Sequence, residues 1–155
     1  MRKARDVSSS DASTETTAAA SSSSASSTAP AAGSAASLPD PRGAGPYRVV
    51  MVCTGNICRS AMAEVVLRDR LAAAGIPDSG SGGVTVTSAG VSDEERGNPI
   101  DSRARRVLTE AGYGVGADDV SRATAIAIAS HTAHRVTDAE IAEADLLLAM
   151  TDSHW

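Results

Sequence analysis

Residues 53–60, CTGNICRS, combine side chains that together could carry out a nucleophilic displacement on an oxyanion. A cysteine opens the segment, and an arginine and a serine close it. Backbone N–H groups at a helix N-terminus and a nearby guanidinium both favour a thiolate, so Cys53 is expected to be a nucleophile. The same donors would hold the equatorial oxygens of a phosphoryl group, with Arg59 bidentate to two of them. This pattern predicts in-line attack and a phosphocysteine intermediate.

The residues between the cysteine and the arginine suit a tight loop. Gly55 permits an unusual backbone angle, and Asn56 tolerates the left-handed region while its amide can tie the loop together. Ser60 can donate to the Cys53 sulfur and ease its departure when water attacks the intermediate. The Gly-Lys-Ser/Thr end of a Walker phosphate loop does not follow the glycine, which excludes that class of nucleotide site.

The flanking segments are those that such a loop needs. The apolar run 49–52 ends at Cys53 and predicts a strand over residues 47–52, buried on both faces of a parallel sheet. Residues 60–74 have an apolar stripe at helical spacing and are followed by Gly75, so they predict a helix. A strand therefore delivers the cysteine to a loop at the start of a helix.

The remaining elements follow from periodicity and from capping signals. Strands are expected at residues 84–88 and 146–150, and helices at 101–111 and 137–144, the latter behind a capping box. Residues 113–130 indicate no single element. The alternation of strands and helices predicts a three-layer α/β fold with a parallel sheet flanked by helices on both faces.

Composition divides the chain into two parts. Residues 1–45 are mostly small or polar and cannot bury enough surface to offset their ordering entropy, so we expect a disordered tail and linker there and a folded domain over 46–155. The net charge of −5 argues against nonspecific nucleic-acid binding, and no apolar segment approaches the roughly 20 residues of a membrane span. Both cysteines lie in one loop, which favours a reactive thiol in the cytoplasm over a secreted disulfide scaffold.

The loop resembles the signature of the low-molecular-weight protein tyrosine phosphatase family, which has the same order of residues. The resemblance extends to about 105 residues and implies the family's four-stranded parallel sheet, of which three strands are recognisable here. It implies a bacterial-type hydrolase that acts on phosphotyrosine proteins or small aryl phosphates, without a cofactor or metal. The further segments that carry the resemblance are residues 60–64, 87–90, 97–104, 131–135 and 145–150.

The resemblance also assigns roles to the loop residues. Cys53 would be the nucleophile and Arg59 the group that stabilises the transition state. At the position of Ile57, the superfamily has an aliphatic residue in members that act on aryl phosphates and a threonine in members that act on phosphoarginine. The resemblance therefore favours phosphotyrosine as the substrate. Cys58 would be the family's second cysteine, able to form a reversible disulfide with the nucleophile and protect it from overoxidation. The expected phosphate-binding loop consists of Thr54, Gly55, Asn56, Ile57, Cys58 and Ser60.

One expected part is missing from the sequence. The family uses as general acid an aspartate in an Asp-Pro pair far downstream of the nucleophile, and no such pair follows Cys53. Asp40 and Pro41 form a pair in the linker, where we expect a turn, and Asp152 is a poor substitute. We therefore expect a C-terminally truncated member with no general acid, an unpaired third strand and an exposed sheet face. Its turnover of phosphotyrosine should fall by about 10²–10⁴-fold.

For several other features the sequence favours a structural role over a functional one. Residues 94–96 are Glu-Glu-Arg where the family often has an aromatic wall, and aromatics make up 2% of the chain, so peptide specificity is not implied. His131 and His134 are expected to be solvated loop residues rather than metal ligands. The arginines at 103, 105 and 106 are expected to form a solvated helix face.

Two other functions remain open from the sequence. An arsenate reductase shares this loop and fold, although only a kind that uses an external thiol fits, because no cysteine follows Cys58. A non-catalytic phosphate-binding fragment would agree with the missing acid. Thiol-dependent arsenate reduction would distinguish the first of these, and anion binding without turnover the second.

Overall fold

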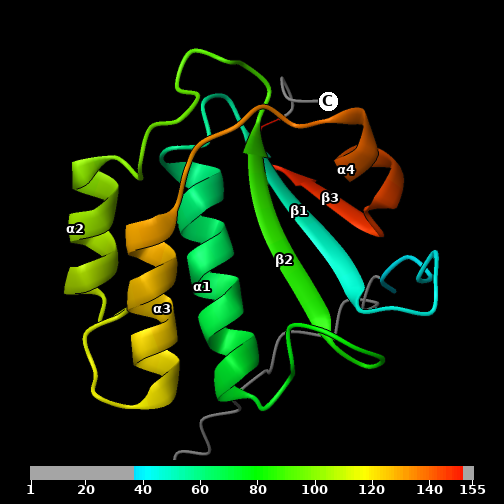
Figure 1. Cartoon of the computed structure of the whole chain (residues 1–155), viewed down its shortest axis with the longest axis horizontal. Coiled ribbons are helices and arrows are strands. Elements are labelled where there is room, and N and C mark those ends of the chain that lie inside the picture. The colour runs from blue at the N-terminus through cyan, green and yellow to red at the C-terminus, as the bar shows by residue number, and fades with distance from the viewer. Residues whose placement is uncertain (1–36, 152–155) are drawn as a thin grey trace, which may run out of the picture. The chain divides into compact units, whose positions relative to one another are not determined.

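Three parallel strands form one sheet in the order β2-β1-β3, with β1 in the centre (Figure 1). The computed structural model describes residues 37–151. β1 spans Tyr47–Cys53, β2 spans Val84–Gly90 and β3 spans Leu146–Ala149. The three predicted strands and their parallel pairing are confirmed. Within the described residues β3 has a neighbouring strand on one side only.

Four helices complete the described part of the chain: α1 (Arg59–Ala73), α2 (Ser102–Glu110), α3 (Asp119–Ser130) and α4 (Asp138–Glu143). The predicted helices are confirmed, and α3 occupies the segment for which the sequence indicated no single element.

The predicted caps are present. The Asp101 side chain accepts the backbone N–H of Arg103 at 2.9 Å, and Thr137 forms a capping box with Glu140. These local bonds satisfy N–H groups that a helix leaves unpaired at its start.

The apolar run of β1 is buried on both faces of the sheet. Val49 and Met51 pack with Val86 against the leucines of α1, while Val50 and Val52 pack on the opposite face with the end of α4. Because successive side chains of a strand point to opposite faces, a strand covered on both sides needs a continuous apolar sequence. The predicted α/β architecture with helices on both faces is confirmed.

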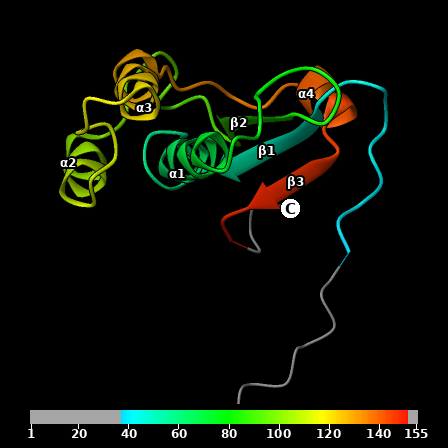
Figure 2. The same ribbon diagram turned by 90° about the horizontal axis from the view of Figure 1, so that it is seen from below.

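The helices are not distributed evenly. α1 covers one sheet face, and α2 and α3 pack against α1 rather than against the strands (Figures 1 and 2). Their shared core contains Ala61 and Val65 of α1 together with Ile100 and Leu108. On this side of the sheet, α1 therefore lies between the strands and the other two helices, α2 and α3.

The described part of the expected linker contacts the domain. The Tyr47 hydroxyl donates to the carbonyl of Pro39 at 3.1 Å, and the backbone N–H of Arg42 donates to the Asp145 carboxylate at 2.5 Å. Asp152 and residues 1–36 of the expected tail lie outside the described residues, so the predicted domain boundary stays a prediction. Within residues 37–151 no helix is both long enough and apolar enough to cross a membrane.

Candidate active site

Cys53 is the last residue of β1, and α1 begins at Arg59, so the loop between them lies at the carboxyl edge of the sheet. The cysteine is buried, and Asn56 and Ser60 have no exposed surface. The strand, the loop and the helix thus have the arrangement that the sequence predicted. The loop closes directly onto the helix N-terminus, where backbone N–H groups favour a bound anion.

Two groups lie within hydrogen-bond distance of the sulfur. The backbone N–H of Asn56 donates to Sγ of Cys53 at 3.3 Å, and the Ser60 hydroxyl lies 3.0 Å from the same atom. Both contacts can stabilise negative charge on sulfur. The sulfur therefore lies inside a loop whose N–H and hydroxyl groups can donate to it.

Asn56 has a backbone φ of 58°, in the left-handed region. Its Nδ2 donates to the hydroxyls of Ser88 at 2.8 Å and Ser60 at 3.1 Å. Its Oδ1 accepts the backbone N–H of His134 at 3.2 Å. Three elements therefore hold one buried amide, which compensates for the unfavourable backbone angle.

Arg59 lies at the open side of the loop. Its Nη2 donates to the Thr54 hydroxyl at 3.4 Å, a long contact, and within residues 37–151 it forms no ion pair. Since no carboxylate of residues 37–151 neutralises the guanidinium, it can bind the oxygens of a phosphoryl group.

The sequence did not indicate three residues that support the loop. Ser88 lies on β2, and the Nε2 atom of His131 lies 2.7 Å from the carbonyl of Asn56. Both histidines lie in a loop, as expected, but they are half-buried and hydrogen-bonded rather than fully solvated, because His134 also contacts the Cys53 loop through its backbone and pairs with Glu140 at 2.8 Å. The meeting of parallel strand ends at one sheet edge could have indicated Ser88, but no local signal indicated the histidines.

A close approach explains one glycine of this edge. A Cβ added to Gly90 would lie 2.6 Å from the carbonyl oxygen of Thr54 and within 3.3 Å of the backbone of Asn56. The end of β2 and the loop therefore pack backbone against backbone, which only glycine allows.

Cys58 is a free thiol immediately before α1. Burial raises the pKa of Cys58, and the charges of Asp101 and Cys53 raise it further. The arginines at 59 and 103 oppose this change but do not reverse it. Cys58 is therefore protonated at neutral pH and does not compete as a nucleophile.

The rim of the loop is acidic rather than aromatic. The Glu95 side chain lies against Gly55, where an added Cβ would be 2.8 Å from its Cγ, and its carboxylate accepts from Asn98 at 2.7 Å. Arg96 pairs with Asp93 at 2.7 Å. Residues 94–96 include no aromatic side chain that could line the entrance to the loop, in agreement with the sequence.

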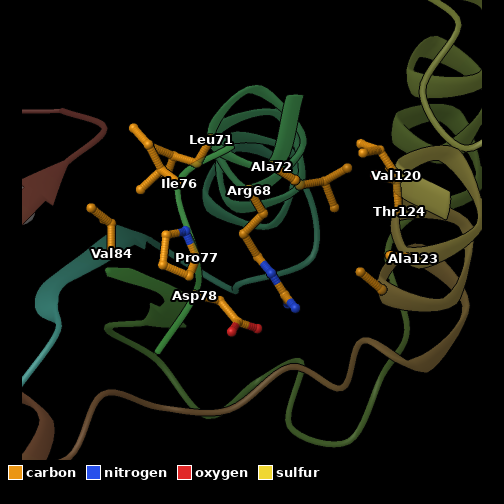
Figure 3. Close-up of a pocket in the computed structure, with 12 residues that line it drawn as sticks. Arg68, Leu71, Ala72, Ile76, Pro77, Asp78, Val84, Val120, Ala123 and Thr124 are labelled. Carbon is orange, nitrogen blue, oxygen red and sulfur yellow. The ribbon is translucent and has the colours of Figure 1, made fainter. Parts of the chain in front are cut away.

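The other residues considered from the sequence are not part of the loop. The arginines at 103, 105 and 106 are exposed on α2, as expected for a solvated face. Among the described residues no group of three or more potential ligands could hold a metal ion. A pocket of about 220 Å³ lies between α1 and α3, towards the C-terminal end of α1, and both Arg68 and Asp78 point into it (Figure 3).

Residues 48–155 match the family described as low molecular weight phosphotyrosine protein phosphatase. The match includes the whole loop and every described helix and strand beyond the first residue of β1. The chain belongs to this family.

Members of this phosphatase family from other organisms show how far the likeness extends. A low molecular weight protein-tyrosine-phosphatase of Streptomyces coelicolor is 35% identical over 108 residues, which is 70% of this chain and 55% of the relative. The low molecular weight protein-tyrosine phosphatase A of Mycobacterium tuberculosis is 38% identical over 109 residues, with the same two coverages. The chain thus spans about half the length of the curated relatives it matches.

Solved structures give the same picture. The low molecular weight protein tyrosine phosphatase from T. tengcongensis superimposes with a TM-score of 0.54 at 35% identity and covers 70% of this chain and 60% of its own. YfkJ from Bacillus subtilis gives a TM-score of 0.56 at 28% identity. The described α/β arrangement is therefore that of the phosphatase family.

Proposed function

We propose that this member of the phosphatase family hydrolyses phosphotyrosine monoesters through a phosphocysteine intermediate. The observation that carries the proposal is the position of the Cys53 sulfur between the Asn56 N–H and the Ser60 hydroxyl at the start of α1. The guanidinium of Arg59, which forms no ion pair within residues 37–151, lies beside the loop and would supply the charge that an incoming phosphate dianion needs.

In the first proposed step the thiolate of Cys53 attacks phosphorus. The S–P bond forms while the P–O bond to the aryl group breaks, and the electron pair leaves with the phenol oxygen. The loop N–H groups and Arg59 hold the three equatorial oxygens throughout, because these donors are already aimed at the charge of the transition state. Gly55 and Ile57 contribute backbone N–H groups to this loop.

In the second proposed step water attacks the phosphocysteine and the S–P bond breaks. The sulfur leaves as a thiolate, and the Ser60 hydroxyl at 3.0 Å can donate to it as charge develops. Water loses one proton to the medium, and inorganic phosphate is released. Cys53 is then ready for another cycle.

The sequence supplies no Asp-Pro pair after Cys53 to protonate the leaving phenol oxygen. We propose that the leaving group itself then decides the rate of the first step for this chain. A nitrophenolate leaves readily without a proton, whereas the phenolate of tyrosine needs one. If no other group donates that proton, the poorer leaving group loses general-acid catalysis worth about 10²–10⁴-fold.

The test compares para-nitrophenyl phosphate with phenyl phosphate, using the full chain and phosphate release as the readout. We expect hydrolysis of the nitrophenyl ester, no hydrolysis by Cys53→Ser, and a rate ratio between the esters above about 100. Arg59→Lys should retain anion binding but lose most of kcat, since a lysine cannot bind two oxygens in one plane. Absence of turnover with retained phosphate binding would instead support a non-catalytic phosphate-binding chain.

We further propose that the chain acts in the cytoplasm on phosphotyrosine proteins or small aryl phosphates. A nucleophilic thiol beside a second free cysteine needs a reducing compartment to stay active. We place the catalytic domain at 46–155 and expect Cys58 to form a disulfide with Cys53 under oxidation.

A further inference from the structure

A surface pocket lies between α1 and α3, near the end of α1 that is remote from the Cys53 loop (Figure 3). Its volume is about 220 Å³, and it is bounded by the second half of α1, the segment after α1, the first residue of β2 and one side of α3. A cavity of about 150 Å³ holds benzene, so this pocket has room for a small organic molecule. None of the described residues that line it belongs to the Cys53 loop, so the pocket is separate from the phosphate site.

Most of the pocket wall is apolar, with side chains from both helices and from β2. These side chains include Val65, Leu71, Ile76, Val84, Val120 and Ala123. Ile76 is 36% exposed, so part of the apolar wall is open to water. Covering it with an apolar group is favourable, roughly in proportion to the area removed from water. The wall therefore favours a ligand with an apolar portion.

Two side chains of opposite charge, Arg68 and Asp78, point into this pocket (Figure 3). Nη1 of Arg68 donates to Glu64 at 3.2 Å, and the other oxygen of Glu64 accepts the Ser88 hydroxyl at 2.6 Å. The Asp78 carboxylate has no hydrogen-bond or ion-pair partner among residues 37–151, and Arg68 is not paired with it. The guanidinium therefore keeps donors for a ligand, and the Asp78 carboxylate keeps all its acceptor sites.

Thr124 of α3 adds a third polar group to the lining of the pocket. The residue is buried, and its hydroxyl donates to Asp69 of α1 at 2.7 Å. A hydroxyl has a single proton, so the Thr124 oxygen can accept a further hydrogen bond but cannot donate one. The polar side chains of the lining thus provide one cationic donor and two acceptors.

Arg68 and Asp78 together select against a ligand with a single charge. A carboxylate alone would pair with Arg68 but would also face the carboxylate of Asp78. An ammonium group alone would pair with Asp78 but would face the guanidinium. A molecule that carries both charges satisfies both side chains, because its carboxylate accepts from Arg68 while its ammonium group donates to Asp78.

We propose that the pocket between α1 and α3 binds a free apolar α-amino acid. Its carboxylate contacts Arg68, its ammonium group contacts Asp78, and its side chain packs against the apolar wall. Arg68 is 44% exposed, and ion pairs with exposed side chains are weak, so we expect a dissociation constant of about 1 mM. The site is independent of the phosphatase reaction, since it uses no residue of the Cys53 loop.

The experiment titrates the full chain, isotope-labelled for backbone amide NMR, with L-leucine. We expect saturable shifts of the amide signals around Arg68, Asp78 and Thr124, with a midpoint near about 1 mM. Isocaproate lacks the ammonium group of leucine, and leucinamide lacks its carboxylate. Each should bind about tenfold more weakly than leucine, the effect of losing one hydrogen bond between charged groups.

Two variants at exposed positions test the assigned contacts. Asp78→Asn should weaken leucine binding about tenfold and leave isocaproate binding no weaker, because the ammonium group loses its partner while the carboxylate loses a repulsive neighbour. Ala123→Leu keeps every charge but fills the pocket from α3, so it should abolish the shifts. Asp138→Asn, at an exposed acid of α4 on the other sheet face, is the matched control and should change nothing.

Three results would overturn the proposal: no amide shifts with leucine up to about 10 mM, an unchanged leucine affinity in Asp78→Asn, or equal binding of leucine and isocaproate. The amide spectrum itself shows whether each variant is folded. If Ala123→Leu is not, Asp78→Asn decides alone, since its side chain has no contact to lose. The titration needs no turnover, so a failure of the phosphatase proposal would appear only in the ester assay.

Discussion

Replacing Asn56 is the sharpest test of how the loop is held. The change Asn56→Ala removes three side-chain hydrogen bonds from a residue with no exposed surface. It also leaves a β-carbon on a backbone with φ of 58°. Two separate costs are therefore introduced, one from the amide and one from the backbone.

The magnitudes can be separated with a second variant. Three hydrogen bonds at about 1 kcal/mol each give about 3 kcal/mol. The left-handed backbone adds about 1 kcal/mol for alanine, because the asparagine side chain no longer compensates for it. Asn56→Gly loses the same hydrogen bonds but adopts this φ freely, although it loses more entropy on folding. We expect the free energy of unfolding to fall by about 4 kcal/mol for alanine and by about 3.5 kcal/mol for glycine, whose extra entropy loss of about 0.5 kcal/mol offsets part of its advantage.

Urea unfolding followed by circular dichroism at neutral pH measures both variants. A loss of 4 kcal/mol is a large part of the 5–15 kcal/mol of a typical domain, so the variants should also be examined at low temperature. A loss below about 1 kcal/mol for Asn56→Ala would show that the amide network does not stabilise the loop. Greater stability of the alanine variant than of the glycine variant would refute the account of the backbone angle.

Three further changes have defined outcomes. Gly90→Ala places a Cβ 2.6 Å from the Thr54 carbonyl and should cost about 1–3 kcal/mol in urea unfolding; an unchanged midpoint would contradict the close packing. The backbone N–H groups of Arg42 and Arg48 donate to the Asp145 carboxylate and hold its pKa below the usual range. The stability that the ionised Asp145 carboxylate contributes is therefore fully present above about pH 4 and is lost on further acidification. Asp145→Asn should flatten the acid side of a curve of unfolding free energy against pH. After peroxide treatment of Cys58→Ser, dithiothreitol should not restore the activity of Cys53, because no disulfide protects its thiol. Full recovery of activity would exclude a protective disulfide.

The rim of the loop that contains Cys53 is acidic. Glu95 lies directly against Gly55, and the only nearby cation of the segment, Arg96, is paired with Asp93. The phosphate loop itself depends on donors that lie beneath this rim, in α1 and in the loop backbone. In the proposed reaction, the groups that would bind the phosphoryl group are thus separate from those that would contact the rest of the substrate.

The sequence by itself determined the parts of this protein that are local. The apolar run before Cys53, the loop and the helix after it are contiguous, and each follows from periodicity, capping and loop chemistry acting over a few residues. For the same reason Asp101 and Thr137 could be identified as caps before the structure was described.

Only the tertiary structure decided what supports the loop. Ser88, His134 and Glu64 come from β2, from an extended segment after α3 and from α1, and they meet at or beside Asn56. Their meeting depends on the pairing of β1 with β2, which places Ser88 opposite Met51, and on the bridge between Gly90 and residue 135. Register and packing between distant segments leave no periodic trace in a sequence, whereas a strand, a loop and a helix that follow one another do.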